Sequence, residues 1–86
     1  MRLDAWLWHA RVAKSKAECG ALIEACGFRL NRQPVNKAHA KLRVGDVLTF
    51  AWQEEVRVWR VLALGERRGP VSEARLLYEE IPTAEQ

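Results

Sequence analysis

The sequence predicts an α+β fold in which an N-terminal helix-turn-helix packs on a small, mostly antiparallel, twisted sheet. Two stretches before Gly27 repeat apolar residues with a helical period, and a capping signal separates them. After Gly27 the apolar residues fall in short runs of high β propensity that alternate with turn residues. A chain of 86 residues, 49% of them hydrophobic, suits one compact domain. We therefore predict a single domain over residues 1–81 and a tail over residues 82–86.

The first helix is expected from about Leu3 to Val12. Its apolar residues have the spacing of one helical stripe, at Leu3, Trp6, Leu7 and Ala10. Asp4 falls in the first turn, where a carboxylate meets free backbone N–H groups and the positive end of the helix dipole. Arg11 lies off the apolar stripe, so we expect its side chain to be exposed.

The second helix begins with a capping box. Ser15 is the expected N-cap, and Glu18, three residues later, is expected to reach back with its carboxylate. The stripe that follows has the same helical spacing, at Cys19, Leu22, Ile23 and Cys26. Gly27 can then adopt the positive φ that ends a helix. Because only a few residues around Ala13 and Lys14 join the helices, the turn between them is tight.

The rest of the domain is expected to consist of short strands and loops. We predict strands over residues 28–30, 34–35, 47–52 and 56–64. The alternation blurs within the last of these strands, which predicts a bulge. Loops are expected over residues 36–43 and 65–70, the second with Arg67-Arg68 at its centre. Residues 74–81 close the domain as either a final strand or a short helix.

The two cysteines, Cys19 and Cys26, are expected to be buried free thiols. Their spacing would place them two turns apart on one helical face, which is too far for an easy disulfide. A zinc site would also need His9 or His39, and the sequence has no CxxC or HxxxH spacing. We expect no metal site.

Signals for export or membrane insertion are not found. Arg11, Lys14 and Lys16 interrupt the apolar residues near the N-terminus, so no signal-peptide core follows Met1. No apolar run approaches the roughly 18 residues of a membrane span. We expect a cytoplasmic monomer without membrane contacts.

Catalytic and cofactor-binding motifs are not found either. GxGxxG, Walker A and HExxH patterns do not occur. Neither histidine lies in a recognisable motif, and Ser15 already has a capping role. The paired acids at residues 54–55 and 79–80 are more simply solvated turns or strand ends. We expect no enzyme activity, no cofactor and no small-molecule substrate.

The charge is divided unevenly between the two halves of the chain. Residues 1–45 carry nine Lys and Arg against three acids, a net charge of +6. Residues 46–86 carry five Arg against eight acids, a net charge of −3, which accounts for the total of +3. A solvated basic face would explain this division, but a surface that binds a polyanion is the more specific interpretation.

The basic residues of the first half gather around the junction of the two helices. Arg11, Lys14 and Lys16 lie beside the start of the second helix, where free N–H groups and the dipole favour phosphate oxygens. Further cations that could join them are Arg2, one helix length back, and Lys37, Lys41 and Arg43 in the following loop. A-form RNA calls for such a surface, because its deep major groove hides the base edges. Trp8 is expected either to cover the core or to act as a stacking platform here.

A longer pattern runs through this half: Arg2-Leu3-Asp4-x-x-Leu7, Arg11, Lys14-Ser15-Lys16, Leu22-Ile23, Gly27-x-x-x-Asn31, Lys37 and Leu42-x-x-Gly45-Asp46-x-Leu48. It resembles the S4 RNA-binding domain, which is named after small-subunit ribosomal protein four and also occurs on pseudouridine synthases and tyrosyl-tRNA synthetases. The resemblance covers about half of the chain. It is specific, because it requires apolar, basic and turn residues together.

A second pattern extends the resemblance over most of the chain: Trp6-Leu7-Trp8 and Arg67-Arg68-Gly69-Pro70-x-Ser72-Glu73-Ala74-x-Leu76-Leu77-Tyr78-Glu79-Glu80. It is similar to a family of ribosome-associated heat-shock proteins of fifteen kilodaltons. This similarity implies binding to ribosomal RNA of free large subunits, including those that carry peptidyl-tRNA, and a role in recycling them under heat stress. The long basic C-terminal extension of that family has no counterpart up to Gln86. The implied RNA-facing residues are Arg2, Arg11, Lys14, Ser15, Lys16, Lys37 and Lys41.

One turn departs from the pattern of that family. The usual Asn-Gly is here Asn31-Arg32. We expect either that Arg32 adopts a positive φ, at a cost of roughly 1 kcal/mol, or that the turn is longer.

Two alternative functions remain open from the sequence. The first keeps RNA as the ligand but makes it a tRNA or another structured RNA. The second is of a different class, a protein–protein adaptor whose basic face meets an acidic partner.

Overall fold

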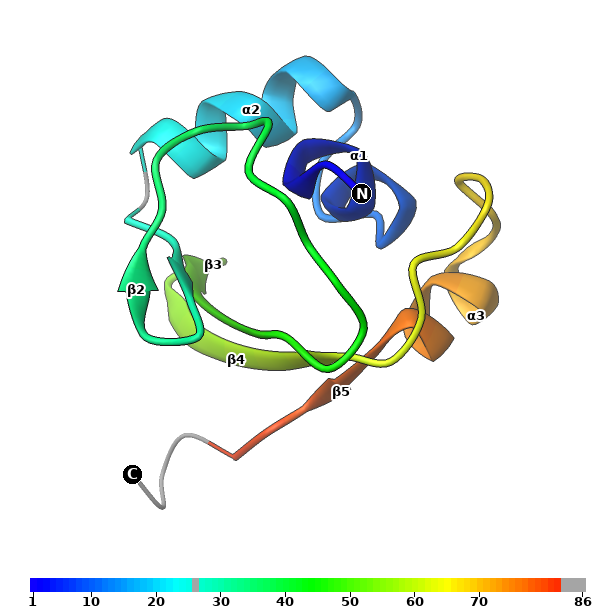
Figure 1. Cartoon of the computed structure of the whole chain (residues 1–86). Helices are drawn as coiled ribbons and strands as arrows, with labels where there is room; N and C mark the ends of the chain where they lie inside the picture. The colour runs from blue at the N-terminus through cyan, green and yellow to red at the C-terminus, as the bar shows by residue number, and fades with distance from the viewer. Residues whose placement is uncertain (26, 83–86) are drawn as a thin grey trace.

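Two N-terminal helices lie against one face of a curved five-stranded sheet (Figure 1). The structure is a computed structural model that describes residues 1–25 and 27–82. The predicted place of Cys26 on the helical stripe and most of the predicted tail therefore lie outside the described residues. The elements are α1 (Leu3–His9), α2 (Lys16–Ala25), β1 (Arg29–Leu30), β2 (Gln33–Pro34), β3 (Val47–Trp52), β4 (Glu55–Val61), α3 (Val71–Ala74), the 3-10 helix η1 (Arg75–Leu77) and β5 (Tyr78–Glu80).

The sheet has the strand order β2-β1-β3-β4-β5, and every neighbouring pair is antiparallel. The predicted fold class, a helix-turn-helix on a small antiparallel sheet, is confirmed. Strand β3 has the predicted bounds, because its residues have high β propensity and turns limit it on both sides.

Helix α1 ends earlier than predicted. Its last helical residue is His9, and Ala10 is the C-cap. Arg11 follows with a φ of 62°, a left-handed conformation that turns the chain out of the helix. The predicted end at Val12 is therefore wrong. The apolar period continues beyond the helix because Val12 is buried even though it is not helical.

The predicted capping box at the start of α2 is confirmed. The Ser15 Oγ accepts a hydrogen bond from the Glu18 N–H at 3.1 Å, as expected of an N-cap. The Glu18 carboxylate reaches back, but it accepts from the N–H of Lys14 at 3.3 Å, one residue further than expected. Gly27 has the predicted positive φ, at 63°.

Replacing Ser15 with alanine is expected to lower the free energy of unfolding by about 1 kcal/mol, because the Glu18 N–H loses its acceptor. The measurement is urea denaturation followed by circular dichroism. Ser72→Ala, at an exposed position on α3, is the matched control and should change stability by less than about 0.5 kcal/mol. Equal stabilities of Ser15→Ala and the native protein would contradict the assigned cap.

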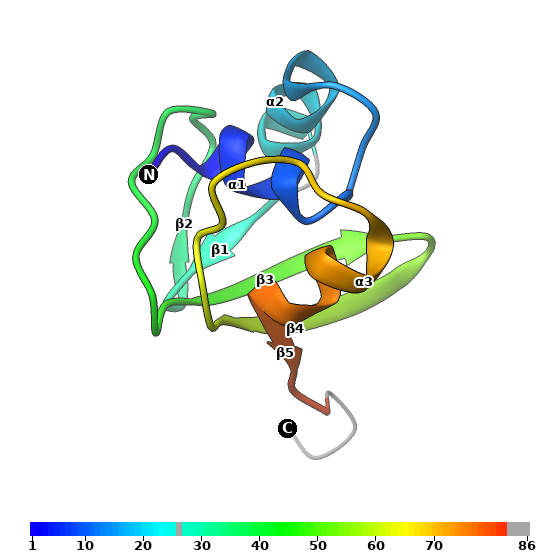
Figure 2. The ribbon, with the colours of Figure 1, turned by 90° about the vertical axis from the view of Figure 1, so that its right-hand side faces the viewer.

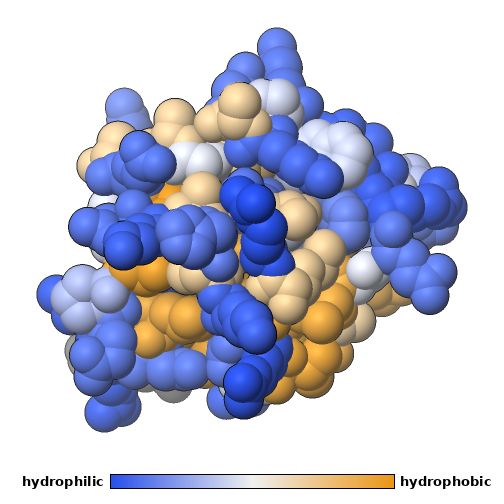
Figure 3. Space-filling view, turned by 45° about the horizontal axis from the view of Figure 1, so that its top comes forward, coloured by the Kyte–Doolittle hydropathy of each residue, from blue (hydrophilic) through white to orange (hydrophobic). Residues whose placement is uncertain are grey.

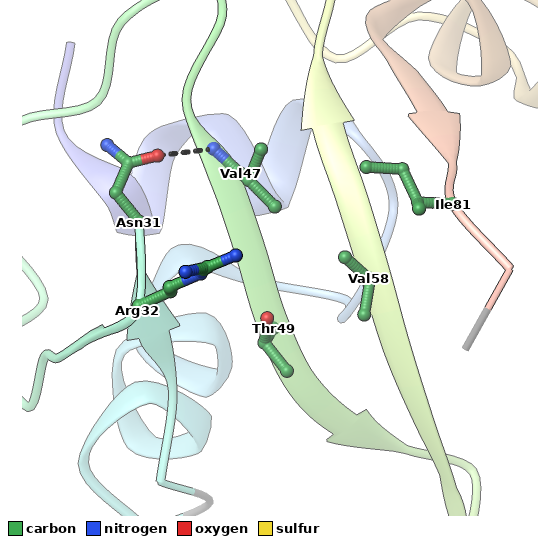
Figure 4. A pocket seen from close by; sticks show the side chains of 6 residues that line it. All are labelled: Asn31, Arg32, Val47, Thr49, Val58 and Ile81. Atoms are coloured by element: carbon green, nitrogen blue, oxygen red, sulfur yellow. Dashed lines mark hydrogen bonds between the residues drawn. The ribbon is translucent and has the colours of Figure 1, made fainter. Parts of the chain in front are cut away.

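The β3–β4 ladder contains no bulge. Its register is continuous from Val47 opposite Arg60 to Trp52 opposite Glu55. Just after β4, the N–H groups of Leu62 and Ala63 both donate to the Leu77 carbonyl, at 2.8 and 3.2 Å, so two residues oppose one as in a bulge. The predicted bulge therefore lies after the paired strand and not within it. The alternation in the sequence blurs because both faces of β4 are covered there. Trp59 faces the helices and is 1% exposed, while Val58 points to the other face and is 4% exposed. Figure 4 shows Val58 beside Ile81 and Thr49, in a groove on that outer face which Arg32 also lines.

Both hairpin turns in the sheet have two residues with positive φ. Asn31 and Arg32 have φ values of 51° and 72°, and Gln53 and Glu54 have values of 53° and 66°. The first of the two expectations for Arg32 is therefore confirmed. The Asn31 side chain helps to hold the turn, since its Oδ1 accepts from the Val47 N–H at 2.9 Å (Figure 4).

The end of the chain combines the two structures that the sequence left open. A short helical stretch, α3 followed by η1, leads directly into β5, which pairs with β4. The open choice between helix and strand over residues 74–81 is thus resolved as one after the other.

The core lies between the helices and the sheet and is rich in aromatic rings. Trp6 on α1 is fully buried, and its Nε1 donates to the carbonyl of Ala63 at 2.9 Å. Trp59 stacks on Tyr78 with ring centroids 3.6 Å apart and packs edge-on against Phe50 at 4.9 Å. These contacts join α1, the middle of the sheet and β5 into one unit.

Candidate RNA interface

The loop over residues 35–46 lies against the start of α1. The N–H of Leu3 donates to the Ala40 carbonyl at 2.8 Å, and the N–H of Leu42 donates to the Met1 carbonyl at 2.7 Å. As a result, the backbones of Arg2 and Lys41 form an isolated antiparallel β-bridge. The loop cations therefore lie at the start of α1, whereas the helix junction is at its other end, about 10 Å along a seven-residue helix.

The side chain of Arg2 is held in place by Asp4, which lies in the first turn of α1 as predicted. Its Nε and Nη2 donate to the two carboxylate oxygens of Asp4 at 3.1 and 3.0 Å. Asp4 is 8% exposed and also accepts from the Ala5 N–H. The Arg2 side chain keeps 61% of its surface exposed, so this ion pair orients the guanidinium while leaving it accessible.

Lys14 and Lys16 are the exposed cations of the junction. Both side chains are exposed, and among the described residues neither lies within ion-pair distance of an acid. Ser15 between them is half-buried and holds the cap of α2. Its role is thus to form the helix start on which the two lysines are displayed.

Arg11 differs from the expectation. Its side chain is half-buried, and its Nε donates to the carbonyl of Gly69 at 2.6 Å. The expected full exposure of Arg11 is therefore wrong. The reason is tertiary, because a loop 58 residues further along the chain supplies the acceptor.

Trp8 lies between the core and this surface. It is half-buried and packs against the core cluster, yet two cations stand by its ring: Lys16 Nζ is 5.2 Å and Arg68 Cζ is 5.7 Å from the centroid. The expectation that Trp8 covers the core therefore holds in part, and its role as a stacking platform stays a prediction. Distances of this order allow cation–π attraction, which orients the two side chains around the ring.

Arg68 is the member of this surface that sequence reasoning missed. It lies in the loop between β4 and α3, and its Nη2 is 3.5 Å from the carbonyl of Ala13 in the junction. The Arg67-Arg68 pair within a Gly- and Pro-containing loop was the available signal. Nothing local in the sequence indicates which of the two arginines faces Trp8. Arg67 instead pairs with Glu73 at 3.0 Å.

The uneven charge of the chain is reinforced by ion pairing. Most arginines of the second half are neutralised by neighbouring acids: Arg57 with Glu55 and Glu80, Arg60 with Glu79, and Arg67 with Glu73. Within the described part of the first half, the Arg2–Asp4 pair is the only ion pair. Figure 3 shows hydrophilic side chains spread over the face that carries α2 and the start of α1, with apolar patches between them.

The side chains that could support catalysis or bind a metal ion are buried or lie apart from one another. Burial raises the pKa of the Cys19 thiol to about 11, which makes it a poor nucleophile and a poor metal ligand at neutral pH. His9 is 7% exposed, and its Nδ1 lies 3.2 Å from the Leu64 carbonyl. Within residues 1–25 and 27–82, no three His, Cys, Asp or Glu side chains are grouped so as to hold a metal ion. Over the same residues, no helix has the length and apolar character of a membrane span.

Comparison with known families agrees with this arrangement of basic residues on a capped helix pair. The S4 domain family matches residues 1–48, which is more than half of the chain. The chain therefore belongs to the S4-domain family, the class of RNA-binding modules that the sequence pattern indicated.

Within this family, the chain is similar to proteins named heat shock protein 15. The chain is 40% identical over 80 residues to heat shock protein 15 of Escherichia coli strain K12, covering 93% of this chain and 59% of that protein. It is 35% identical over 80 residues to the heat shock protein 15 homolog of Haemophilus influenzae, covering 93% and 60%. The chain thus spans about 60% of the length of these curated relatives.

A solved structure supports the same relationship. Heat shock protein 15 of Vibrio cholerae, described as trimeric, matches with a TM-score of 0.86 and 26% identity. The match covers 94% of this chain and 81% of that one. The fold and the sequence therefore point to the same relatives.

Proposed function

We propose that this protein is a non-catalytic RNA-binding protein that binds structured RNA through Arg2 before α1, the cations of the α1–α2 junction and those of the loop over residues 35–46. The observation that carries the proposal is the pair of exposed lysines, Lys14 and Lys16, without acidic partners among the described residues, at the capped start of α2. Cations at a helix start supplement the partial positive charge of its N–H groups, so phosphate oxygens are favoured.

We further propose that the target is ribosomal RNA of the large subunit, in the cytoplasm, and that binding assists the recycling of dissociated subunits under heat stress. The similarity to heat shock protein 15 supports this assignment. The proposed contacts are made by Arg2, Arg11, Lys14, Lys16, Lys37, Lys41 and Arg68, with Ser15 holding the helix start.

A salt titration tests the proposed function. Binding of the full chain to isolated large subunits, small subunits and tRNA is measured by filter binding over a range of salt concentrations. About six phosphate contacts predict a slope of log affinity against log salt of roughly −4 to −5. We expect the large subunit to bind most tightly.

The other outcomes identify the alternatives. Tighter binding to tRNA would replace the ribosomal target with a tRNA. A nearly flat salt dependence would contradict a phosphate-binding surface. Capture of a partner that survives ribonuclease treatment, together with a flat slope, would favour a protein–protein adaptor.

A further inference from the structure

A cleft of about 510 Å³ opens between the turn of the β3–β4 hairpin and the α3–η1 segment. In Figure 2, α3 lies close to the turn of this hairpin, and the end of α1 is nearby. The lining residues that matter for binding are three aromatic side chains and three arginines: Trp52, Trp59, Tyr78, Arg11, Arg57 and Arg75. None of them except Arg11 belongs to the RNA interface described above.

The aromatic residues form a stepped platform. Trp59 is 1% exposed and stacks on Tyr78, with an interplanar angle of 8°. Trp52 meets Trp59 edge-on, at 5.6 Å and 82°. Trp52 and Tyr78 are both half-buried and line the cleft, and Trp59 contacts both rings.

The charge of the cleft favours an anionic ligand. Three arginines and one glutamate, Glu80, line it, and Arg57 is also paired with Glu55 at 3.0 Å, so the local net charge is +1. Glu80 is itself paired with Arg57 at 3.2 Å. Arg75 is exposed and has no acidic partner among the described residues, so its charge is available to a ligand.

Two lining residues also carry donors without acceptors. Within the described part of the chain, three buried side-chain nitrogens have no hydrogen-bond partner, and two of them are Trp59 Nε1 and Arg57 Nε. A buried donor without an acceptor is costly, and its presence at a binding cleft is a common exception to the rule that such groups are paired. The aromatic rings and the positive charge of the cleft together indicate a ligand that combines a flat ring with an anionic group.

We propose that this cleft binds one unstacked nucleotide of a single-stranded RNA segment, with its base against Trp52 and Tyr78 and its phosphate near Arg75 and Arg11. Aromatic rings bind bases of any sequence by stacking, and arginines hold the adjoining backbone. Arg11 connects this site to the junction, because it directly follows the C-cap of α1 and is one of the residues that line the cleft. The inference rests on the proposed RNA-binding function and extends it to single-stranded RNA next to a duplex.

The test compares two RNA probes, a blunt hairpin and the same hairpin with a short single-stranded tail of uridines. We expect the tail to raise the affinity of the native protein about tenfold, the effect of one stacked base. Arg75→Glu and Trp52→Ala should abolish this gain while binding the blunt hairpin as the native protein does. Arg29→Glu, an exposed cation on β1 outside the cleft, should keep the gain.

A second measurement locates the base directly. Tails that contain 5-iodouridine are photo-crosslinked to the full chain, and mass spectrometry identifies the modified residue. Crosslinks at Trp52 or Tyr78 are expected. A tail that adds no affinity, a gain that survives Arg75→Glu, or crosslinks confined to other residues would overturn the inference while hairpin binding upholds the proposed function. Failure of the native protein to bind either probe would overturn both.

Discussion

A protein that carries Lys14→Glu and Lys16→Glu is expected to bind its RNA at least about 100-fold more weakly than the native protein at moderate salt. Each reversal removes a charge-assisted contact to phosphate and adds repulsion, so a combined loss of about 3 kcal/mol is a conservative figure. Two fewer phosphate contacts should also make the salt slope less steep by roughly 1.5 to 2. Filter binding over a salt series measures both quantities.

The fold should survive this double variant, because both lysine side chains are exposed and form no ion pair with a described acid. Arg11 is not a suitable partner in such a variant. Its hydrogen bond to Gly69 and its φ of 62° make it part of the fold, so its loss would mix stability with binding. A thermal melt of the double variant checks that the protein remains folded.

The matched control is Arg29→Glu with Arg32→Glu, which makes the same change in net charge on the β1–β2 hairpin. Glutamate should be tolerated at position 32, since Glu54 occupies the equivalent turn position with a φ of 66°. We expect the control to lose less than about tenfold in affinity, through its longer-range effect alone. Equal losses in the two variants would mean that binding follows net charge and not the junction.

Trp6→Ala is expected to lower the free energy of unfolding by about 3–5 kcal/mol. Trp6 is fully buried, and its Nε1 bond to Ala63 ties α1 to the segment that follows β4. Small domains have only about 5–15 kcal/mol of stability, so this variant should be partly unfolded at growth temperatures. Urea denaturation followed by circular dichroism gives the value.

Trp8→Ala is the control for this prediction. Trp8 is only half-buried and donates no hydrogen bond among the described residues, so we expect a loss of about 2 kcal/mol. This variant should also weaken RNA binding, because Lys16 and Arg68 lose the ring that orients them. If Trp6→Ala were no more destabilising than Trp8→Ala, the core role given to Trp6 would be contradicted.

The parts of the fold that were predicted correctly depend on neighbours in the chain. The N-cap at Ser15 requires only the N–H of Glu18 three residues later, and strand β3 requires only β-prone residues between two turns. The positive φ of Arg32 was one of two expectations for its turn, and it is the one that a two-residue hairpin turn requires. Such features are legible in a sequence because their causes lie within a few residues of one another.

The predictions that failed depended on contacts across the fold. The end of α1 at His9 could not be predicted from the apolar period, since Val12 is buried without being helical. The blurred alternation did not locate the bulge, which lies just after β4, where the Leu77 carbonyl accepts from the N–H groups of both Leu62 and Ala63. Within β4 the alternation blurs because Val58 is also covered on the outer face, where Ile81 lies beside it and donates its N–H to the Val58 carbonyl at 2.7 Å.

The sequence by itself determined the fold class, the capped start of α2 and the excess of cations in the first half, because periodicity, capping and composition are local properties. Only the tertiary structure decided which cations share a surface. It placed Arg68 beside Trp8, moved Arg11 toward the cleft and put the loop cations at the start of α1. The physical reason is that these positions are set by hydrogen bonds between residues far apart in the chain. Arg11 and Gly69 are separated by 58 positions, and Trp6 and Ala63 are separated by 57.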